Sequence, residues 1–199
     1  MATQFDKKHI HAITKERIRD IYSDEINAFF QRKINLLNMG GAESAQEKNL
    51  NLRGLLKNAV SIEIEKIKQE EAKRTAPENV EVLRGNIFKY LMTGEEDTII
   101  FDTVNTFVKR HQWFEFLSNN RILKKTLIII NVVDHIRAPK NLNLDSKEFY
   151  KEYGFIQDIK NRVENGIVRL IENPRIVEYK NSSSGQPMVS YFFKFDIAA

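Results

Sequence analysis

The chain has 199 residues, 42% of them apolar, so it is long and apolar enough to bury a hydrophobic core and is unlike a disordered protein. Its 31 basic and 27 acidic residues leave a formal charge of +4, which by itself is a weak sign of an anionic partner. The absence of cysteine excludes disulfides, thiolate metal sites and cysteine nucleophiles. No apolar run reaches the roughly 20 residues of a membrane helix and no secretory signal is visible, so we expect a cytoplasmic protein without a membrane partner.

Apolar residues recur at helical spacing through most of the first 120 residues. This spacing predicts helices over residues 8–37, 50–74, 80–92 and 98–117. Gly40 and Gly41 are interpreted as the terminator of the first helix, and Pro77 as the end of the second. We therefore expect residues 1–120 to form a helical region that oligomerises or binds protein partners.

The remaining residues, 121–199, predict three helices followed by two strands. The helices are expected over residues 122–136, 146–154 and 156–172, the last of them ending at Asn173-Pro174 because proline disfavours helix in the preceding residue. The strands Arg175–Lys180 and 188–196 are joined by a polar loop, and Phe192 on the outer face of the second strand suggests a second packed surface. The predicted fold is thus mostly α with a C-terminal β-hairpin, a helical region followed by an α+β unit.

This C-terminal order of elements resembles the winged-helix superfamily. The segment DSKEFYKEYG corresponds to the first helix of a helix-turn-helix, FIQDIKNRVENGIVRLIEN to the recognition helix and PRIVEYKNSSSGQPMVSYFFKFD to the wing. The unit is also similar to the last domain of plasmid-type replication initiators. The resemblance implies a winged-helix-like domain over residues 121–199 that binds DNA.

The face of the predicted recognition helix opposite its apolar side carries Asn and Arg, which can pair with adenine and guanine edges. The expected DNA contacts of this helix are Asn161, Arg162, Asn165 and Arg169. The expected backbone contacts of the wing are Lys180, Ser182, Ser183 and Ser184. The same residues also suit a solvated helix face and an ordinary exposed hairpin loop, and that alternative stays open.

A second resemblance involves the same segment. RVENGIVRLIENPRI followed by YFFKFDIAA looks like the end of the small baseplate wedge family of phage tails and type VI secretion systems. The Glu-Pro-Arg signature of that family corresponds here to Asn173, Pro174 and Arg175, so the glutamate is replaced. This resemblance implies a structural subunit of a multiprotein assembly, either a baseplate component or a winged-helix protein adaptor.

Sites for enzymatic chemistry are not evident in the sequence. His9 and His11 are two residues apart and point to different sides of a helix, so no metal site is expected. The segment EIEK, from Glu63 to Lys66, is interpreted as part of a solvated helix rather than a nuclease motif. Gly40-Gly41 lacks the Lys-Ser/Thr of a phosphate loop. We therefore expect no enzymatic activity and no cofactor.

Together these features predict a non-catalytic DNA-binding protein, replication initiator-like or regulatory, with a C-terminal winged helix. The expected partners are DNA and either protein partners or further copies of the chain, bound through the N-terminal helices. The alternative is the assembly subunit described above.

Overall fold

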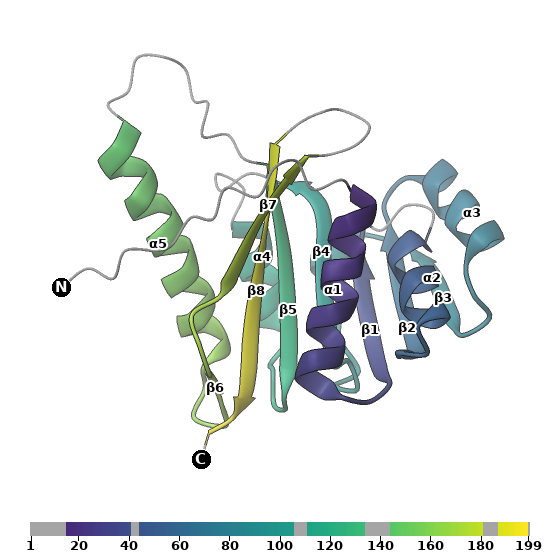
Figure 1. The fold of residues 1–199 in the computed structure, drawn as a ribbon, viewed down its shortest axis with the longest axis horizontal. Helices are drawn as coiled ribbons and strands as arrows, with labels where there is room; N and C mark the ends of the chain where they lie inside the picture. Colours follow the sequence, from purple (N-terminus) through teal and green to yellow (C-terminus); the bar gives the residue numbers. More distant parts are fainter. Residues whose placement is uncertain (1–14, 41–43, 106–110, 134–143, 181–186, 199) are drawn as a thin grey trace.

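An eight-stranded mixed β-sheet forms the centre of the molecule (Figure 1). The computed structural model describes residues 15–40, 44–105, 111–133, 144–180 and 187–198. The strand order is β3-β2-β1-β4-β5-β8-β6, and β7 pairs with β8 beside β6. The first five strands are parallel, whereas β8 runs antiparallel to β5, β6 and β7.

The five parallel strands all begin within segments that the sequence pattern assigned to helices. They are β1 (Ile34–Met39), β2 (Leu56–Glu63), β3 (Val80–Arg84), β4 (Thr98–Asn105) and β5 (Thr126–Val133). In β5 every residue from 126 to 132 is buried, because helices cover both faces of the sheet. A strand buried on both faces is a continuous apolar run without two-residue alternation, so its sequence resembles a buried helix. The prediction of a mostly α fold is therefore wrong, and the chain is an α/β protein.

Helices lie on both faces of the sheet (Figure 1). They are α1 (Lys15–Phe30), α2 (Ala45–Leu52), α3 (Lys66–Thr75), α4 (His111–Asn119) and α5 (Leu144–Val163), with a 3-10 turn η2 at Ile87–Lys89. One core contains α1 and α2, which contribute Ile18, Tyr22, Ile26 and Leu50. The other core contains α4 and α5, where Trp113 packs edge-on against Phe155 at 5.3 Å between ring centroids.

The long C-terminal strand β8 pairs with two shorter strands, β6 and β7. The strands are β6 (Val168–Leu170), β7 (Arg175–Lys180) and β8 (Pro187–Ile197). The predicted strand pair is confirmed, but residues 168–170 are a strand rather than part of a helix that continues to Asn173-Pro174. The helix predicted over 146–154 continues through Gly154 as α5, which ends at Val163. The hairpin is built into the central sheet through β5 and is not a projecting wing.

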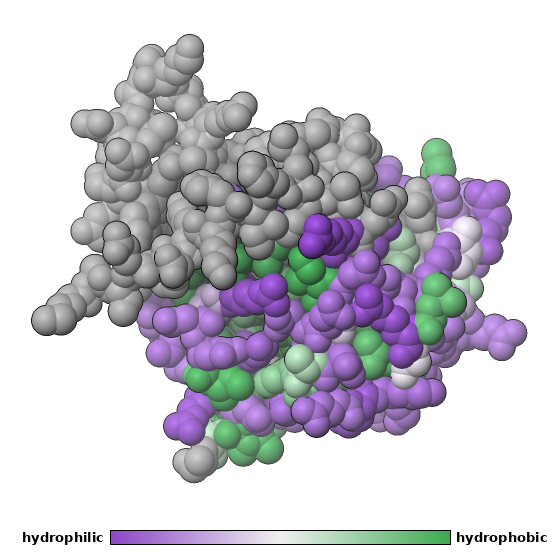
Figure 2. Space-filling model, viewed as in Figure 1, coloured by the Kyte–Doolittle hydropathy of each residue, from purple (hydrophilic) through white to green (hydrophobic). Residues whose placement is uncertain are grey.

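Both faces of β8 are covered, as the alternation of its residues suggested. Phe193 packs on the α4 and α5 side, whereas Phe192 packs edge-on against Tyr22 of α1 at 5.5 Å between ring centroids. Phe192 and Met188 are 1% and 4% exposed, so neither forms an apolar docking patch of the kind an assembly subunit would present. In Figure 2, the apolar atoms of the described residues on the viewed face form separate spots among hydrophilic ones.

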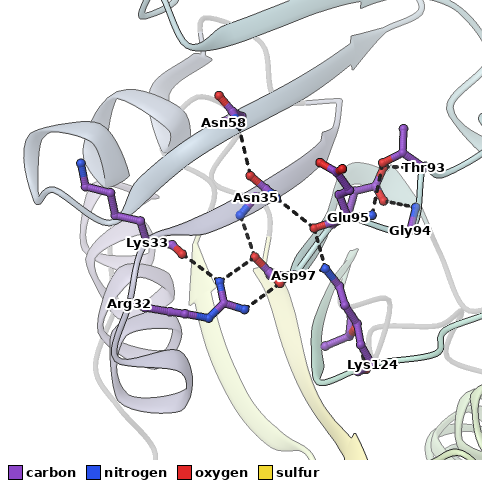
Figure 3. Close-up of polar contacts among 11 residues, drawn as sticks. Arg32, Lys33, Asn35, Asn58, Thr93, Gly94, Glu95, Asp97 and Lys124 are labelled. Carbon is purple, nitrogen blue, oxygen red and sulfur yellow. Dashed lines mark hydrogen bonds and ion pairs between the residues drawn. The ribbon is translucent and has the colours of Figure 1, made fainter.

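The amino ends of the parallel strands are joined by polar contacts to Asp97, the residue before β4 (Figure 3). Its two carboxylate oxygens accept hydrogen bonds from Arg32 at 2.9 and 3.1 Å, and one of them also accepts from the backbone N–H of Asn35 at 2.9 Å. Lys124 forms an ion pair with the same carboxylate at 3.0 Å. These partners keep the pKa of Asp97 below its usual value despite burial. Asp97 thereby links the starts of β1, β4 and β5.

The boundary expected near residue 120 falls just after α4, and the strands on its two sides, β4 and β5, pair in the same sheet. None of the helices that the structure describes is both long and apolar enough to cross a membrane.

Candidate functional site

The strand order places a ligand site at the carboxyl ends of β1 and β4. From β1 the chain moves outward through β2 to β3 and then returns to β4 on the opposite side of β1. In open α/β sheets, ligands bind outside the carboxyl ends of the strands at this point of reversal. Gly40 follows β1 with φ of +84°, a left-handed conformation that favours glycine. Ser44, which precedes α2, is also left-handed at φ +50° and is buried. The backbone therefore turns sharply at both described ends of this loop.

Four buried oxygens near the carboxyl ends of β1 and β2 have no hydrogen-bond partner among the described residues. They are Asn38 Oδ1, Glu47 Oε2, Ser61 Oγ and Glu63 Oε1. Asn38 and Ser61 are opposite each other in the β1–β2 register, and Glu63 follows on the same face of β2. Buried polar groups are almost always hydrogen-bonded, so such a group of polar atoms, three acceptors and one hydroxyl, calls for an explanation. A bound ligand with donor groups would provide the partners that the chain itself does not.

Glu63 is the last residue of β2, so it lies at the carboxyl end of the strand, where a ligand would bind. Its side chain is nevertheless buried, with only 3% of the residue exposed. Burial is the main reason why the pKa of Glu63 is raised from 4.5 to about 7, and the negative charges of Asp102, Glu65 and Glu47 add to the effect. Lys68 opposes the rise, but its ammonium group is hydrogen-bonded to Glu65 at 2.8 Å. A carboxyl whose pKa is close to neutral, at the end of a strand, is a functional-site candidate.

Glu47 is a second buried acid at the same edge. It lies in the first turn of α2 with no exposed surface, and its Oε1 accepts a hydrogen bond from Asn38 Nδ2 at 2.9 Å. Burial also raises the pKa of Glu47, and the nearby Asn38 amide, the backbone and the Ser61 hydroxyl only partly offset this. Neither Glu47 nor Glu63 forms an ion pair within the part of the chain that the structure describes.

Apolar side chains are exposed next to Glu63. Ile64 is 64% exposed and Ile67, at the start of α3, is 78% exposed. The edge of the sheet at β2 therefore presents a carboxylate beside an apolar surface. This combination suits a ligand that has hydroxyl groups next to a flat apolar ring.

A hydrogen-bonded network continues the polar edge toward β8. Tyr22 of α1 donates to Asn131 Oδ1 at 2.6 Å and contacts Ser190 Oγ at 2.7 Å. Ser190 also donates to Asn131 Oδ1 at 2.6 Å, and Asn131 Nδ2 donates to Asp102 Oδ1 at 3.0 Å. Burial raises the pKa of Tyr22 well above its usual value. This network fixes the carboxylate of Asp102 near the carboxyl end of β4.

The described residues among those predicted to contact DNA are engaged in contacts within the protein. At the end of α5, Arg162 stacks over Phe114 at 4.3 Å and donates to Ser118, while Asn161 accepts from Gln157 at 2.7 Å. Asn165 bonds to backbone groups around it, and Arg169 is exposed on β6 opposite Asp196.

Lys180 is the last residue of β7 and pairs with the start of β8, whereas Arg169 of β6 pairs with the end of β8. The side chain of Lys180, together with Ser182, Ser183 and Ser184, lies outside the described residues. The nucleic-acid contacts named from the sequence therefore stay predictions without a common surface in the described structure.

The interpretation of Glu63 as part of a solvated helix is wrong, since it is a buried residue of β2. A sequence signal for it exists: it is an acid that ends an apolar run, about twenty residues after the glycines at 40 and 41, which is the spacing typical of a ribose-binding acid in a Rossmann-type unit. The signal was missed because the run was assigned to a helix. Gly40 likewise ends a strand and not a helix.

Comparisons with known proteins identify the architecture. No protein-family model matches the chain, and no curated protein matches it in sequence. Solved structures do match. TYW2 of M. jannaschii, determined in complex with AdoMet, has a TM-score of 0.59 at 15% identity, over 96% of this chain and 80% of that one. The plantazolicin methyltransferase BpumL, determined with SAH, has a TM-score of 0.58 at 10% identity, over 89% and 83%. The B. subtilis tRNA methyltransferase TrmK has a TM-score of 0.57 at 12% identity, over 86% and 64%. The chain shares the fold of these three methyltransferases.

This methyltransferase fold overturns the interpretations based on the C-terminal hairpin. The resemblances to winged helices, replication initiators and baseplate wedges are wrong, because the hairpin is the last part of an α/β sheet shared with methyltransferases. The predicted non-catalytic DNA-binding function and the structural-subunit alternative are contradicted for the same reason, as is the expectation that the chain is not an enzyme. DNA and protein partners stay untested predictions.

Proposed function

We propose that the chain is a methyltransferase that binds S-adenosylmethionine (AdoMet) at the carboxyl ends of β1 and β2. The observation that carries the proposal is Glu63, a buried carboxyl at the end of β2 with an oxygen that has no partner among the described residues. The methyltransferase fold supports it, since two proteins of this fold were solved with AdoMet or with its demethylated product SAH.

The residues present fit an adenosyl group. Glu63 can accept hydrogen bonds from ribose hydroxyls, which is the role of the acid at the end of β2 in Rossmann-type sites. Ile64 offers an exposed apolar side chain for one face of the purine. Gly40, without a side chain, allows the backbone after β1 to approach the ligand closely.

A dinucleotide fits the same fold less well. Dinucleotide sites hold a pyrophosphate at the loop after β1 and the helix that follows. In this chain that loop, residues 40–44, contains Glu43 and no basic residue, and Glu47 lies buried in the next helix. Carboxylates would repel a pyrophosphate, whereas AdoMet carries no phosphate. The charge of the site therefore favours an adenosyl ligand without phosphates.

We expect the methyl acceptor to bind at the carboxyl ends of β4 and β5. When bound, AdoMet supplies a methyl group on a positively charged sulfur that is ready for transfer to a nucleophile. Asp102, held by Asn131 and through it by Tyr22 and Ser190, is the acid nearest to the end of β4. Its carboxylate can orient a donor group of the methyl acceptor, and the network keeps that carboxylate in one position.

Equilibrium binding tests the proposal. Calorimetry with AdoMet, SAH, NAD and ATP should give saturable binding of the two adenosyl-amino-acid ligands and none of the phosphate-bearing ones. Substitution Glu63→Ala should weaken binding by roughly tenfold to a hundredfold, because it removes hydrogen bonds to a charged acceptor. Because the ionised carboxylate is the acceptor and the pKa of Glu63 is about 7, affinity for both adenosyl ligands should rise as the pH is raised from 6 to 8.

Glu81→Ala is the matched control. Glu81 is an exposed carboxylate on the neighbouring strand β3, and it lines a different part of the surface from Glu63. This variant should bind as the unaltered protein does. If folded protein binds neither AdoMet nor SAH, or if Glu63→Ala binds them unchanged, the proposal is wrong.

A further inference from the structure

The connection between β3 and β4 leaves part of the sheet uncovered. The other connections between parallel strands carry α2, α3 and α4, whereas residues 85–97 contain only the three-residue turn η2. Beside this segment lies an open groove of about 420 Å³, at the amino ends of β1, β2 and β3. A groove of this size can take a short stretch of another molecule.

Carboxylates line this groove, and none of the described residues that line it is basic. Glu78, Glu81 and Glu95 are exposed around it, and Glu96 is buried in its wall. The three exposed carboxylates form no ion pair within the part of the chain that the structure describes. Burial raises the pKa of Tyr90, and the negative charges of Glu96 and Glu81 raise it further. The groove therefore attracts cations and repels phosphates.

Asparagine side chains at the starts of the strands complete the lining. Asn58 Nδ2 donates to Asn35 Oδ1 at 3.4 Å, and Asn35 Nδ2 donates to the backbone oxygen of Glu95 at 3.1 Å (Figure 3). Asn79 Nδ2 donates to the backbone oxygen of Lys57 at 3.0 Å. The carbonyl oxygens of Asn58 and Asn79 accept no hydrogen bond from the described residues, so they remain as acceptors for a ligand.

The bases drawn near the groove in Figure 3 do not neutralise it. Arg32 donates two hydrogen bonds to Asp97, and Lys124 forms an ion pair with the same carboxylate at 3.0 Å. The side chain of Lys33 points away from Asn35 (Figure 3). A cation that pairs with the groove must therefore come from another molecule.

We propose that this groove binds an arginine-bearing segment of a partner protein. A guanidinium group has five donors and no acceptor, and its planar fork pairs with a carboxylate through two hydrogen bonds. The backbone N–H groups of a peptide suit the oxygens of Asn58 and Asn79. Val60 and Val80 give the groove a partly buried apolar surface on which the aliphatic stem of arginine can pack.

The groove is separate from the proposed cofactor site. Asn58 and Glu63 are five residues apart on β2, which corresponds to about 16 Å along the strand. A segment bound in the groove would thus hold a partner protein on the enzyme without contacting the transferred methyl group.

Binding of defined peptides to the full chain tests the proposal. Labelled hexa-arginine, followed by fluorescence anisotropy, should bind saturably. Hexa-lysine should bind more weakly, because an ammonium group cannot form the bidentate pair. Spermine, a cation without a peptide backbone, should compete poorly, and hexa-glutamate should not bind.

Variants that remove charge locate the binding. Glu78→Gln combined with Glu81→Gln removes two groove carboxylates and should weaken hexa-arginine about fivefold, as expected for the loss of two exposed ion pairs. The matched control combines Glu70→Gln and Glu178→Gln, which change the net charge equally at exposed positions of α3 and β7 outside the groove. The control should bind as the unaltered protein does.

A single cysteine gives a second readout. The chain contains no cysteine, so Thr93→Cys places one thiol in the groove and Lys73→Cys places one on α3 outside it, both at exposed positions. Hexa-arginine should slow the alkylation of the groove thiol by iodoacetamide several-fold and leave that of the α3 thiol unchanged.

Several results would overturn the proposal. They are absence of hexa-arginine binding to the folded chain, equal weakening in the two double variants, tighter binding of spermine than of hexa-arginine, and protection of the groove thiol by an RNA oligonucleotide instead. Affinity for AdoMet and SAH should be the same in the groove variants as in the unaltered protein. A negative result with the peptides therefore leaves the proposed methyltransferase function in place.

Discussion

Buried carboxylates have opposite surroundings at the amino ends and at the carboxyl ends of the parallel strands, called here the amino edge and the carboxyl edge of the sheet. At the amino edge, Asp97 receives two hydrogen bonds from Arg32, one from the backbone of Asn35 and an ion pair with Lys124, and its pKa is lowered (Figure 3). At the carboxyl edge, Glu47 and Glu63 have no ion pair among the described residues, and burial raises the pKa of both. The first arrangement stabilises the fold. The second costs stability and leaves acceptors for a ligand, as is typical of functional sites.

The largest expected effect comes from removing the acid at the amino edge. Asp97→Ala should lower the free energy of unfolding by about 3 kcal/mol at pH 7, because it deletes a buried charge and leaves the groups that it joins without a partner. Since the pKa of Asp97 is lowered, this contribution is present above pH 4 and is lost as the pH falls through the folded-state pKa. Urea unfolding at pH 7 and at pH 3 measures the difference, which should shrink at the lower pH.

Asp196→Ala is the matched control for that substitution. Its ion pair with Lys125 is 3.7 Å long and both side chains are more than a third exposed, so its loss should change stability by less than about 0.5 kcal/mol. Equal effects of the two substitutions would show that the contacts of Asp97 do not stabilise the fold.

A smaller effect of opposite sign is expected at the carboxyl edge. In the absence of ligand, Glu63→Gln should raise the free energy of unfolding by roughly 2 kcal/mol at pH 8, because it removes the cost of ionising a buried carboxyl. The folded-state pKa of about 7 lies above the ordinary value of 4.5, so the folded protein holds more protons between these values. The stability of the unaltered protein should therefore fall as the pH rises from 4.5 to 7, and the variant should lack this fall. A pH series of urea unfolding curves decides the point, and a destabilised variant at pH 8 would contradict it.

The smallest expected effect concerns the hydrogen bonds among Tyr22, Asn131 and Ser190, which lie at the carboxyl ends of the strands near β8. Tyr22→Phe removes a hydroxyl bonded to Asn131 and Ser190, but these two residues remain bonded to each other at 2.6 Å. We expect a loss of about 1 kcal/mol in thermal or urea unfolding. A loss above about 3 kcal/mol would mean that the ring packing against Phe192, and not the hydrogen bonds, is disturbed by the change.

The sequence predicted some elements well and others not at all, and the difference has a physical cause. The strands now called β7 and β8 were found because β8 alternates two packed faces and because a polar loop separates it from β7. The strand β5 was missed because helices cover it on both faces, so that Thr126–Val133 is a mostly apolar run without two-residue alternation. The helix α1 was found at residues 15–30 but was extended into β1, since Ile34 and Leu37 continue the helical spacing.

The candidate site depended on the same error. Glu63 and Asn38 could not be recognised as neighbours while both segments were assigned to helices, although Glu63 stands about twenty residues after Gly40, as a ribose-binding acid does. Glu47 offers no signal of its own, because a glutamate in a helix is usually solvated.

By itself, the sequence determined that the chain has a core, contains no cysteine chemistry and ends in a strand pair, because composition, turn residues and two-residue alternation are local properties. Only the tertiary structure decided that the apolar runs are parallel strands, since their pairing joins residues far apart in the chain. It also decided which acids are buried without partners, because burial and pKa depend on what packs around a side chain and not on its neighbours in sequence.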